Sequence, residues 1–163
     1  SAKALKKGSL AELEFSNILQ ERHPNDWRIA TRNEEVVGHM DFVLKLDNKE
    51  YGIEVKSNKD NLIKGWMLVE FKGISGHPGW LYGDASFLAY ERPNGFMMFS
   101  MEKLRKYIDE TVDMNDYVTN PKEATYKVYN RRGTQDLITL VNLQDLTSKI
   151  KYTFYKKANA PVA

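Results

Sequence analysis

Hydrophobic residues recur along this chain at two different spacings, and each spacing predicts a different element. Over 9–22 the apolar residues lie three or four positions apart, which predicts an amphipathic helix. Over about 40–46 and 51–57 apolar and polar residues alternate, which predicts two strands. The polar segment 47–49 separates these strands, so we expect them to form a tight hairpin.

The same pattern predicts more strands, two further helices and several polar segments. Strands are expected at 27–31, 66–71, 86–90, 96–99, 126–129 and 137–141. Of these, 86–90 is expected to form a hairpin with 96–99, and 126–129 a hairpin with 137–141. Helices are expected at 101–111 and from Asn142 onward, and loops or irregular segments at 32–35, 58–65, 73–83 and 112–123. This order predicts an α/β fold with a mixed central sheet flanked by helices. A chain of 163 residues has the size of a single domain. We expect a core of about 8–112, a C-terminal extension of about 113–157 and a tail of 158–163.

Composition narrows the classes of protein that fit. The chain has no cysteine and a net charge of only +2, which excludes disulfides, thiolate metal sites and a strongly basic coating protein. No apolar run approaches the roughly 18 residues of a membrane span. We therefore expect no membrane association and a cytoplasmic location, in the host cytoplasm if the source is viral.

The charged residues of the predicted hairpin suggest a catalytic site. Strand alternation places Glu54 and Lys56 on one face, and Asp41 lies at the start of the preceding strand. Two carboxylates, with the carbonyl oxygen of Val55 as a third ligand, offer the oxygen donors that Mg²⁺ prefers. Lys56 is suited to orienting a water molecule or holding a phosphate. The alternative is a turn aspartate beside a surface pair of strand residues.

The spacing of these residues resembles that of a known nuclease superfamily. Asp41, twelve intervening residues and then Glu54-Val55-Lys56 are similar to the signature of the PD-(D/E)XK nucleases, with Met40 where the motif name has proline. The resemblance implies a restriction-endonuclease-like core and Mg²⁺-dependent hydrolysis of DNA, with Mn²⁺ as a substitute. It implies that Asp41 and Glu54 bind the metal and that Lys56 acts beside them.

The predicted first helix adds to this resemblance. Lys7-Gly8 followed by the leucine-rich segment up to Leu19 is similar to the first helix of archaeal Holliday junction resolvases. That likeness implies Glu12 as a third catalytic acid, with Glu14 as the fallback, branched DNA as the substrate, a role in DNA recombination and a homodimer. The alternative for Glu12 is a capping-box acid, three residues after Ser9.

Other residues are candidates of lower rank. The segment around Glu70 resembles phage-type nucleases of the same superfamily, which implies a second metal ligand or a support for Lys56; a salt bridge is the alternative. His39, two residues before Asp41, is a candidate for touching phosphate or water. Basic residues suited to DNA contacts are Lys7, Lys59, Lys64, Lys72, Arg131 and Arg132.

The sequence thus predicts a metal-dependent DNA endonuclease, with a structure-selective, junction-resolving enzyme as the leading form. A sequence-specific restriction or homing endonuclease is the alternative, for which 112–163 would supply base contacts. A nucleic-acid-binding module without catalysis is a further alternative, which the presence of Asp41, Glu54 and Lys56 disfavours.

Overall fold

The structure is a computed structural model that describes residues 10–57, 64–73, 75–131 and 133–158. The chain divides into two compact units, which we describe separately. The described residues of the first unit come from Ser1–Ile63, Asp84–Ser100 and Tyr152–Ala163, and those of the second from Lys64–Gly83 and Met101–Lys151. This grouping differs from the expected division near residue 112, because the second unit begins within the expected core.

The first unit contains a sheet of six strands. Across the sheet these are β1 (Trp27–Ile29), β2 (Phe42–Leu46), β3 (Lys49–Lys56), β5 (Phe87–Arg92), β6 (Gly95–Ser100) and β10 (Thr153–Lys156). The β3–β5 pair is parallel and the other neighbours are antiparallel, so the sheet is mixed. The predicted hairpins β2–β3 and β5–β6 are confirmed. In the first, Asp47 and Asn48 have positive φ angles of 50° and 63°, the left-handed conformation that a two-residue hairpin turn requires.

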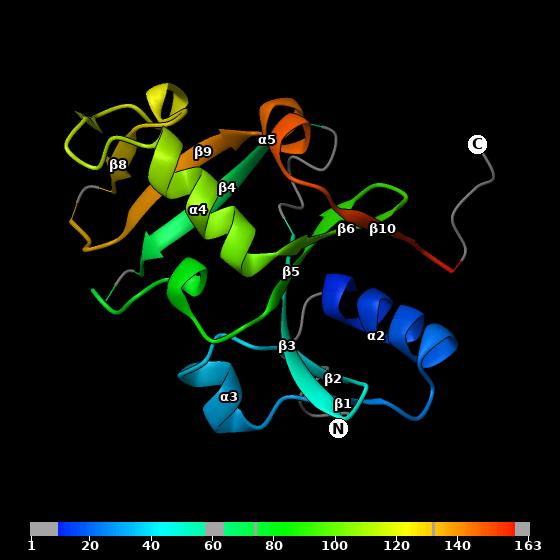
Figure 1. Ribbon diagram of the computed structural model, residues 1–163. Coiled ribbons are helices and arrows are strands. Elements are labelled where there is room, and N and C mark those ends of the chain that lie inside the picture. Colours follow the sequence, from blue (N-terminus) through cyan, green and yellow to red (C-terminus); the bar gives the residue numbers. More distant parts are fainter. Residues whose placement is uncertain (1–9, 58–63, 74, 132, 159–163) are drawn as a thin grey trace. The chain divides into compact units, whose positions relative to one another are not determined.

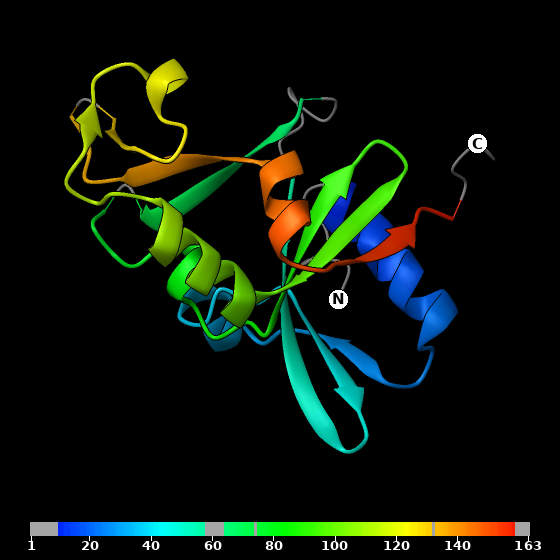
Figure 2. The same ribbon diagram turned by 45° about the horizontal axis from the view of Figure 1, so that its top comes forward.

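One helix of the first unit covers the sheet. The helix α2 (Leu10–Arg22) confirms the predicted first helix, and it lies along the strands in both views (Figures 1 and 2). Its buried side chains, led by Phe15 and Ile18, pack with Ile53 and Val55 of β3 in one apolar core. The Phe15 ring lies 5.1 Å from the Phe96 ring, edge to face. This packing assigns Ile53 and Val55 to the helix side of the sheet, and alternation assigns Glu54 and Lys56 to the other side.

A second helix of the first unit was not predicted. Residues 32–35 were expected to form a loop, but α3 spans Arg32–Val36, so that expectation was wrong. The Thr31 hydroxyl accepts a hydrogen bond from the N–H of Glu34, and the Glu34 carboxylate accepts one from the N–H of Thr31. This capping box satisfies two main-chain donors at once, and it overcomes the polar composition that suggested a loop.

The second unit contains a sheet of four strands. In order these are β4 (Trp66–Lys72), β9 (Leu137–Asn142), β8 (Val128–Asn130) and β7 (Tyr117–Val118). The β7–β8 pair is parallel and the other two pairs are antiparallel. The predicted strand at 66–71 and the predicted second hairpin are therefore confirmed. The segment 112–123, expected to be irregular, contains the two-residue β7 and the short 3-10 helix η3 (Pro121–Glu123).

Helices accompany the second sheet as well. Both α4 (Met101–Thr111) and α5 (Leu143–Lys149) confirm predicted helices, and α4 lies beside β4 and β9 (Figures 1 and 2). The 3-10 helix η2 (Trp80–Tyr82) is tied to α4, because the Arg105 guanidinium donates to the carbonyls of Leu81 and Gly83 at 2.5 and 2.6 Å. The predicted α/β class is confirmed, with two mixed sheets in place of one. Within the described ranges, no helix has the length and apolar character needed to cross a membrane.

Candidate functional site

The start of β2 places Asp41 opposite Glu54. The register pairs Phe42 with Ile53, so one step further along the antiparallel pair Asp41 faces Glu54. The N–H of Asp41 donates to the carbonyl of Ile53 at 2.8 Å, and the carbonyl of Asp41 accepts from the N–H of Ala30 at 3.0 Å. Asp41 is therefore held by main-chain hydrogen bonds to segments on both of its sides.

The Asp41 side chain is fixed as well. Its Oδ2 accepts a hydrogen bond from the N–H of Val55 at 2.8 Å. Burial raises the pKa of Asp41, while the Val55 N–H and the positive charge of Lys56 lower it, and the outcome is a raised pKa. Val55, whose carbonyl oxygen is a predicted metal ligand, thus also orients the carboxylate of Asp41 through its N–H.

Glu54 is a buried acid beside Asp41. It is 5% exposed, and its carboxyl shares a hydrogen bond with the carboxyl of Asp41. Burial and the negative charge of Asp41 raise the pKa of Glu54 to about 9, against the opposing effect of Lys56. At neutral pH Glu54 is consequently protonated, and it donates to Asp41. The acid pair therefore holds one proton, with one positive charge, in place of a divalent cation, which would bring two.

Lys56 completes this group. Its Nζ lies 3.4 Å from Oε1 of Glu54, and its side chain is 40% exposed whereas that of Glu54 is 7% exposed. The amine therefore bridges the buried acid pair and the solvent. The structure brings together Asp41, Glu54 and Lys56, the three residues on which the sequence argument depended.

The turn before Asp41 depends on two glycines. A Cβ at Gly52 would lie 1.9 Å from Sδ of Met40, and one at Gly38 would lie 2.7 Å from the carbonyl oxygen of Glu34. The N–H of Met40 donates to that same Glu34 carbonyl at 3.1 Å. Met40, which stands where the motif name has proline, is thus packed over β3 directly before the acid.

The helix α3 also anchors this turn. The Arg28 guanidinium donates to both carboxylate oxygens of Glu34 at 2.7 and 3.0 Å. These hydrogen bonds, followed by that from the Thr31 N–H, lower the pKa of Glu34 to about 2. The next residue, Glu35, is close enough for its charge to contribute to the raised pKa of Asp41, after the larger effect of burial. Sequence reasoning missed Glu35 because 32–35 was expected to form a loop.

A complete set of three metal-binding acids is not formed. Among the described residues, no group of three histidine, cysteine, aspartate or glutamate side chains is arranged to hold a metal ion. Glu12 is half-buried in the first turn of α2, the helix that packs on the Ile53 and Val55 side of the sheet. Its role as a third acid stays a prediction, and Ser9, its expected capping partner, lies outside the described residues.

Glu14 belongs to a second cluster. The Nζ of Lys157 lies 3.0 Å from Oε2 of Glu14 and 2.7 Å from Oε2 of Glu91. The hydroxyl of Ser57, which follows Lys56, donates to the other oxygen of Glu91. Sequence reasoning missed Glu91 and Lys157, because β10 was not predicted. The β-branched and aromatic residues of Thr153-Phe154-Tyr155 were the available signal, but this strand is only four residues long.

The remaining candidates belong to one or the other unit or lie outside the described residues. Glu70 is half-buried on β4. It belongs to the second unit, which also contains Lys64, Lys72 and Arg131. Arg131 is engaged by the buried Asp136, with Nε 3.3 Å from Oδ2. His39 is half-buried with a φ of 52°. Lys7, Lys59 and Arg132 lie outside the described residues.

Comparison of the chain with protein-family models, with curated proteins and with solved structures finds no match. The argument for function therefore depends on the site itself.

Proposed function

We propose that this chain is a divalent-metal-dependent DNA endonuclease that hydrolyses phosphodiester bonds with Asp41, Glu54 and Lys56. One observation supports this proposal above the others. The Asp41 carboxylate, held at 2.8 Å by the N–H of Val55, lies beside a buried glutamate whose other neighbour, at 3.4 Å, is the Lys56 amine. Two carboxyl groups, the amine of Lys56 and the N–H of Val55 thus meet on two adjacent strands.

The donor set fits a hard cation. Both ligands would be carboxylates, which Mg²⁺ and Mn²⁺ accept, and the raised pKa of Glu54, about 9, is the expected property of an acid pair without its cation. Asp41 and Glu54 would hold the ion, with water and substrate oxygens as further ligands. When bound, such an ion lowers the pKa of a coordinated water and neutralises charge on a phosphoryl oxygen.

Lys56 has the position for contact with the substrate. Its side chain is 40% exposed, so the amine can meet a phosphate that approaches from solvent. It would hold a phosphoryl oxygen or orient the attacking water. These roles need a fixed amine, and the contact of its Nζ with Oε1 of Glu54 at 3.4 Å holds it in place.

The preferred substrate in this proposal is branched DNA, cut by a homodimer. The likeness of 7–19 to junction resolvases supports both points, since a resolvase must cut two strands symmetrically. A sequence-specific cutter with the same site is the alternative, and the choice of DNA in the assay separates the two.

A cleavage panel tests the proposal. Four-way junction, linear duplex, flap and single-stranded DNA are incubated with the protein in Mg²⁺ or in chelator. The variant Asp41→Asn removes one proposed ligand, and Asp47→Asn makes the same chemical change at the far end of the hairpin, where asparagine tolerates the positive φ.

We expect Mg²⁺-dependent cutting by the wild type and by Asp47→Asn, and a loss of at least about 100-fold in Asp41→Asn. Cutting of the junction alone supports the resolvase form, and cutting at one site in long duplex supports the sequence-specific form. Absence of cleavage in all substrates, or equal cleavage by the two variants, would contradict the proposed site.

A further inference from the structure

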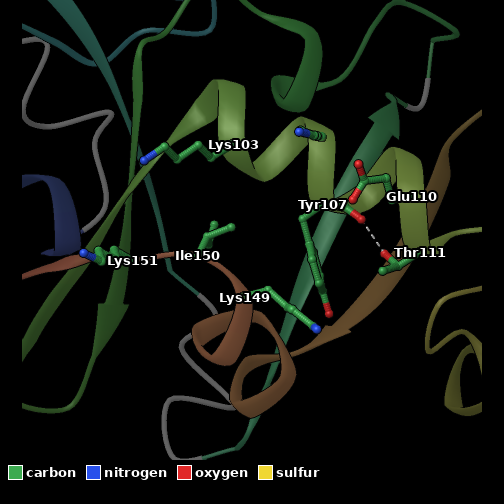
Figure 3. A pocket seen from close by; sticks show the side chains of 8 residues that line it. Lys103, Tyr107, Glu110, Thr111, Lys149, Ile150 and Lys151 are labelled. Atoms are coloured by element: carbon green, nitrogen blue, oxygen red, sulfur yellow. Dashed lines mark hydrogen bonds between the residues drawn. The ribbon is translucent and has the colours of Figure 1, made fainter.

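The second unit contains a pocket that the proposed nuclease site does not use. Its volume is about 590 Å³. It lies between α4 and the segment at the end of α5 (Figure 3). The residues that line it are Lys103, Lys106, Tyr107, Glu110, Thr111, Lys149, Ile150 and Lys151. All of them belong to the second unit, so the pocket is complete within that unit.

Positive charge dominates the lining. Four of the lining residues are lysines and one, Glu110, is an acid. Lys103 and Lys106 are three residues apart on α4 and therefore share a face of the helix. Lys149 and Lys151 flank Ile150 on the opposite wall (Figure 3).

The lysine charges of this pocket are largely uncompensated. In the part of the chain that the structure describes, no carboxylate forms an ion pair with Lys106, Lys149 or Lys151. Several like charges around one concave surface repel each other and raise the local concentration of anions. A bound anion would relieve that repulsion.

The wall of the pocket is rigid where Tyr107 forms it. Tyr107 is 7% exposed, and its hydroxyl lies 2.5 Å from the hydroxyl of Tyr126. Tyr126 in turn donates to Oδ2 of Asp145 at 3.0 Å. This hydrogen bond engages Asp145, an acid of α5. The Thr111 hydroxyl donates to the carbonyl of Tyr107 at 2.7 Å, as Figure 3 shows.

We propose that this pocket binds phosphate esters and holds at least two phosphate groups of a nucleotide or of a nucleic acid strand. The volume, about 590 Å³, falls within the range of roughly 300–1,000 Å³ in which small-molecule sites occur. The lysines on two facing walls offer more positive charge than a single phosphate group needs. Ile150 supplies apolar surface for the remainder of the ligand. This binding does not depend on hydrolysis at Asp41.

The test measures binding in chelator, so that cleavage plays no part. A fluorescent ten-nucleotide thymidine strand is followed by anisotropy, and ATP by calorimetry. The pocket variant is Lys106→Gln with Lys149→Gln. Its matched control is Lys122→Gln with Lys127→Gln, two exposed lysines of the same unit outside the pocket. Circular dichroism shows whether each variant is folded.

We expect the pocket variant to bind at least one of the two ligands about tenfold more weakly near 0.1 M salt, and the control variant to bind within twofold of the wild type. For the strand, we expect the slope of log K against log salt to fall by about 1.4, which corresponds to two lost phosphate contacts at about 0.7 each. Loss for the strand identifies a nucleic acid backbone as the source of phosphate, and loss for ATP alone identifies a free nucleotide.

Two results would overturn the proposal. In one, the wild type binds neither ligand. In the other, the pocket variant and the control variant lose affinity equally, which means that net charge and not the pocket attracts the anion. Because binding is measured in chelator and cleavage in Mg²⁺, failure of the nuclease proposal and failure of this one are distinguishable.

Discussion

Lys157 joins the end of the chain to a buried acid, with its Nζ 2.7 Å from Oε2 of Glu91. Burial lowers the pKa of Lys157, but hydrogen bonds to Glu91 and Glu14 outweigh burial and raise it. The contact attaches the residue after β10 to β5 and, through Glu14, to α2. Three segments that are distant in sequence thus meet at one amine.

Removal of this amine is expected to destabilise the protein. In Lys157→Met the carboxylate of Glu91 stays buried without its cation, and loss of one partner of a buried pair costs about 3 kcal/mol. The adjacent Lys156 is exposed and makes no described ion pair, so Lys156→Met is the matched control. Urea denaturation measures both. Equal stability of the two variants would show that the ion pair contributes nothing.

Glu54 is expected to make stability depend on pH. Its pKa of about 9 in the folded protein exceeds the ordinary value of 4.5, so the folded state retains a proton that the unfolded state loses. The contribution of Glu54 to stability is therefore fully present below pH 4.5 and is lost as pH rises toward 9. In chelator at pH 8, Glu54→Gln is expected to be more stable than the wild type by at least about 1 kcal/mol.

The same variant tests metal binding without an activity assay. Mg²⁺ at 10 mM is expected to raise the melting temperature of the wild type at pH 8, because binding to the folded state stabilises it. We expect no such rise in Glu54→Gln and a normal rise in the control Glu21→Gln, an exposed acid on α2. A rise of equal size in all three proteins would show that the stabilising cation binds at a site other than Glu54.

Short-range patterns in the sequence were sufficient to predict that the residues at the centre of the candidate site come together. Alternation over 40–57 predicted the hairpin and the shared face of Glu54 and Lys56, and the spacing placed Asp41 beside them. Both depend on the period of two and a tight turn, which are local properties. Most helices and hairpins followed from the same local signals.

The pairing of strands that are distant in the sequence could not be predicted from such local patterns. The strand β10 is short and pairs with β6 across more than fifty residues, so the ion pair of Lys157 with Glu91 was not predicted. The division into two sheets was missed because β4 carries the same apolar pattern as β3 but pairs with β9. The five-residue α3 was missed because its capping box lies in a polar segment, and Glu35 was missed with it.

The packing of Met40 against Gly52 is expected to support Asp41. A methyl group at Gly52 would lie 1.9 Å from Sδ and 2.7 Å from Cγ of Met40, so Gly52→Ala must displace that side chain. Overpacking of this kind costs about 1–3 kcal/mol, and the displaced Met40 is bonded directly to Asp41. We expect Gly52→Ala to be less stable and to show a smaller Mg²⁺-induced rise in melting temperature.

A second substitution provides the control for that prediction. In the double variant Met40→Ala, Gly52→Ala the clash is removed, and we expect the Mg²⁺ response to recover at least half of its wild-type size. If the double variant responds no better than Gly52→Ala alone, strain in β3 itself and not displacement of Met40 explains the loss.

The negative charge of Glu35, more than that of Glu12, is expected to favour cation binding at Asp41 and Glu54. Burial is the main cause of the raised pKa of Asp41, and the nearby negative charge of Glu35 makes a smaller contribution in the same direction. Glu12 lies on α2, which packs against the side of β3 that carries Ile53 and Val55, away from Glu54.

Calorimetric titration with Mg²⁺ should therefore show Glu35→Gln binding about three- to tenfold more weakly than the wild type, since one nearby negative charge contributes about 1 kcal/mol at an exposed site. Glu12→Gln and Glu21→Gln should bind as the wild type does. The opposite ranking, with Glu12→Gln impaired and Glu35→Gln unchanged, would instead support the resolvase-like role of Glu12.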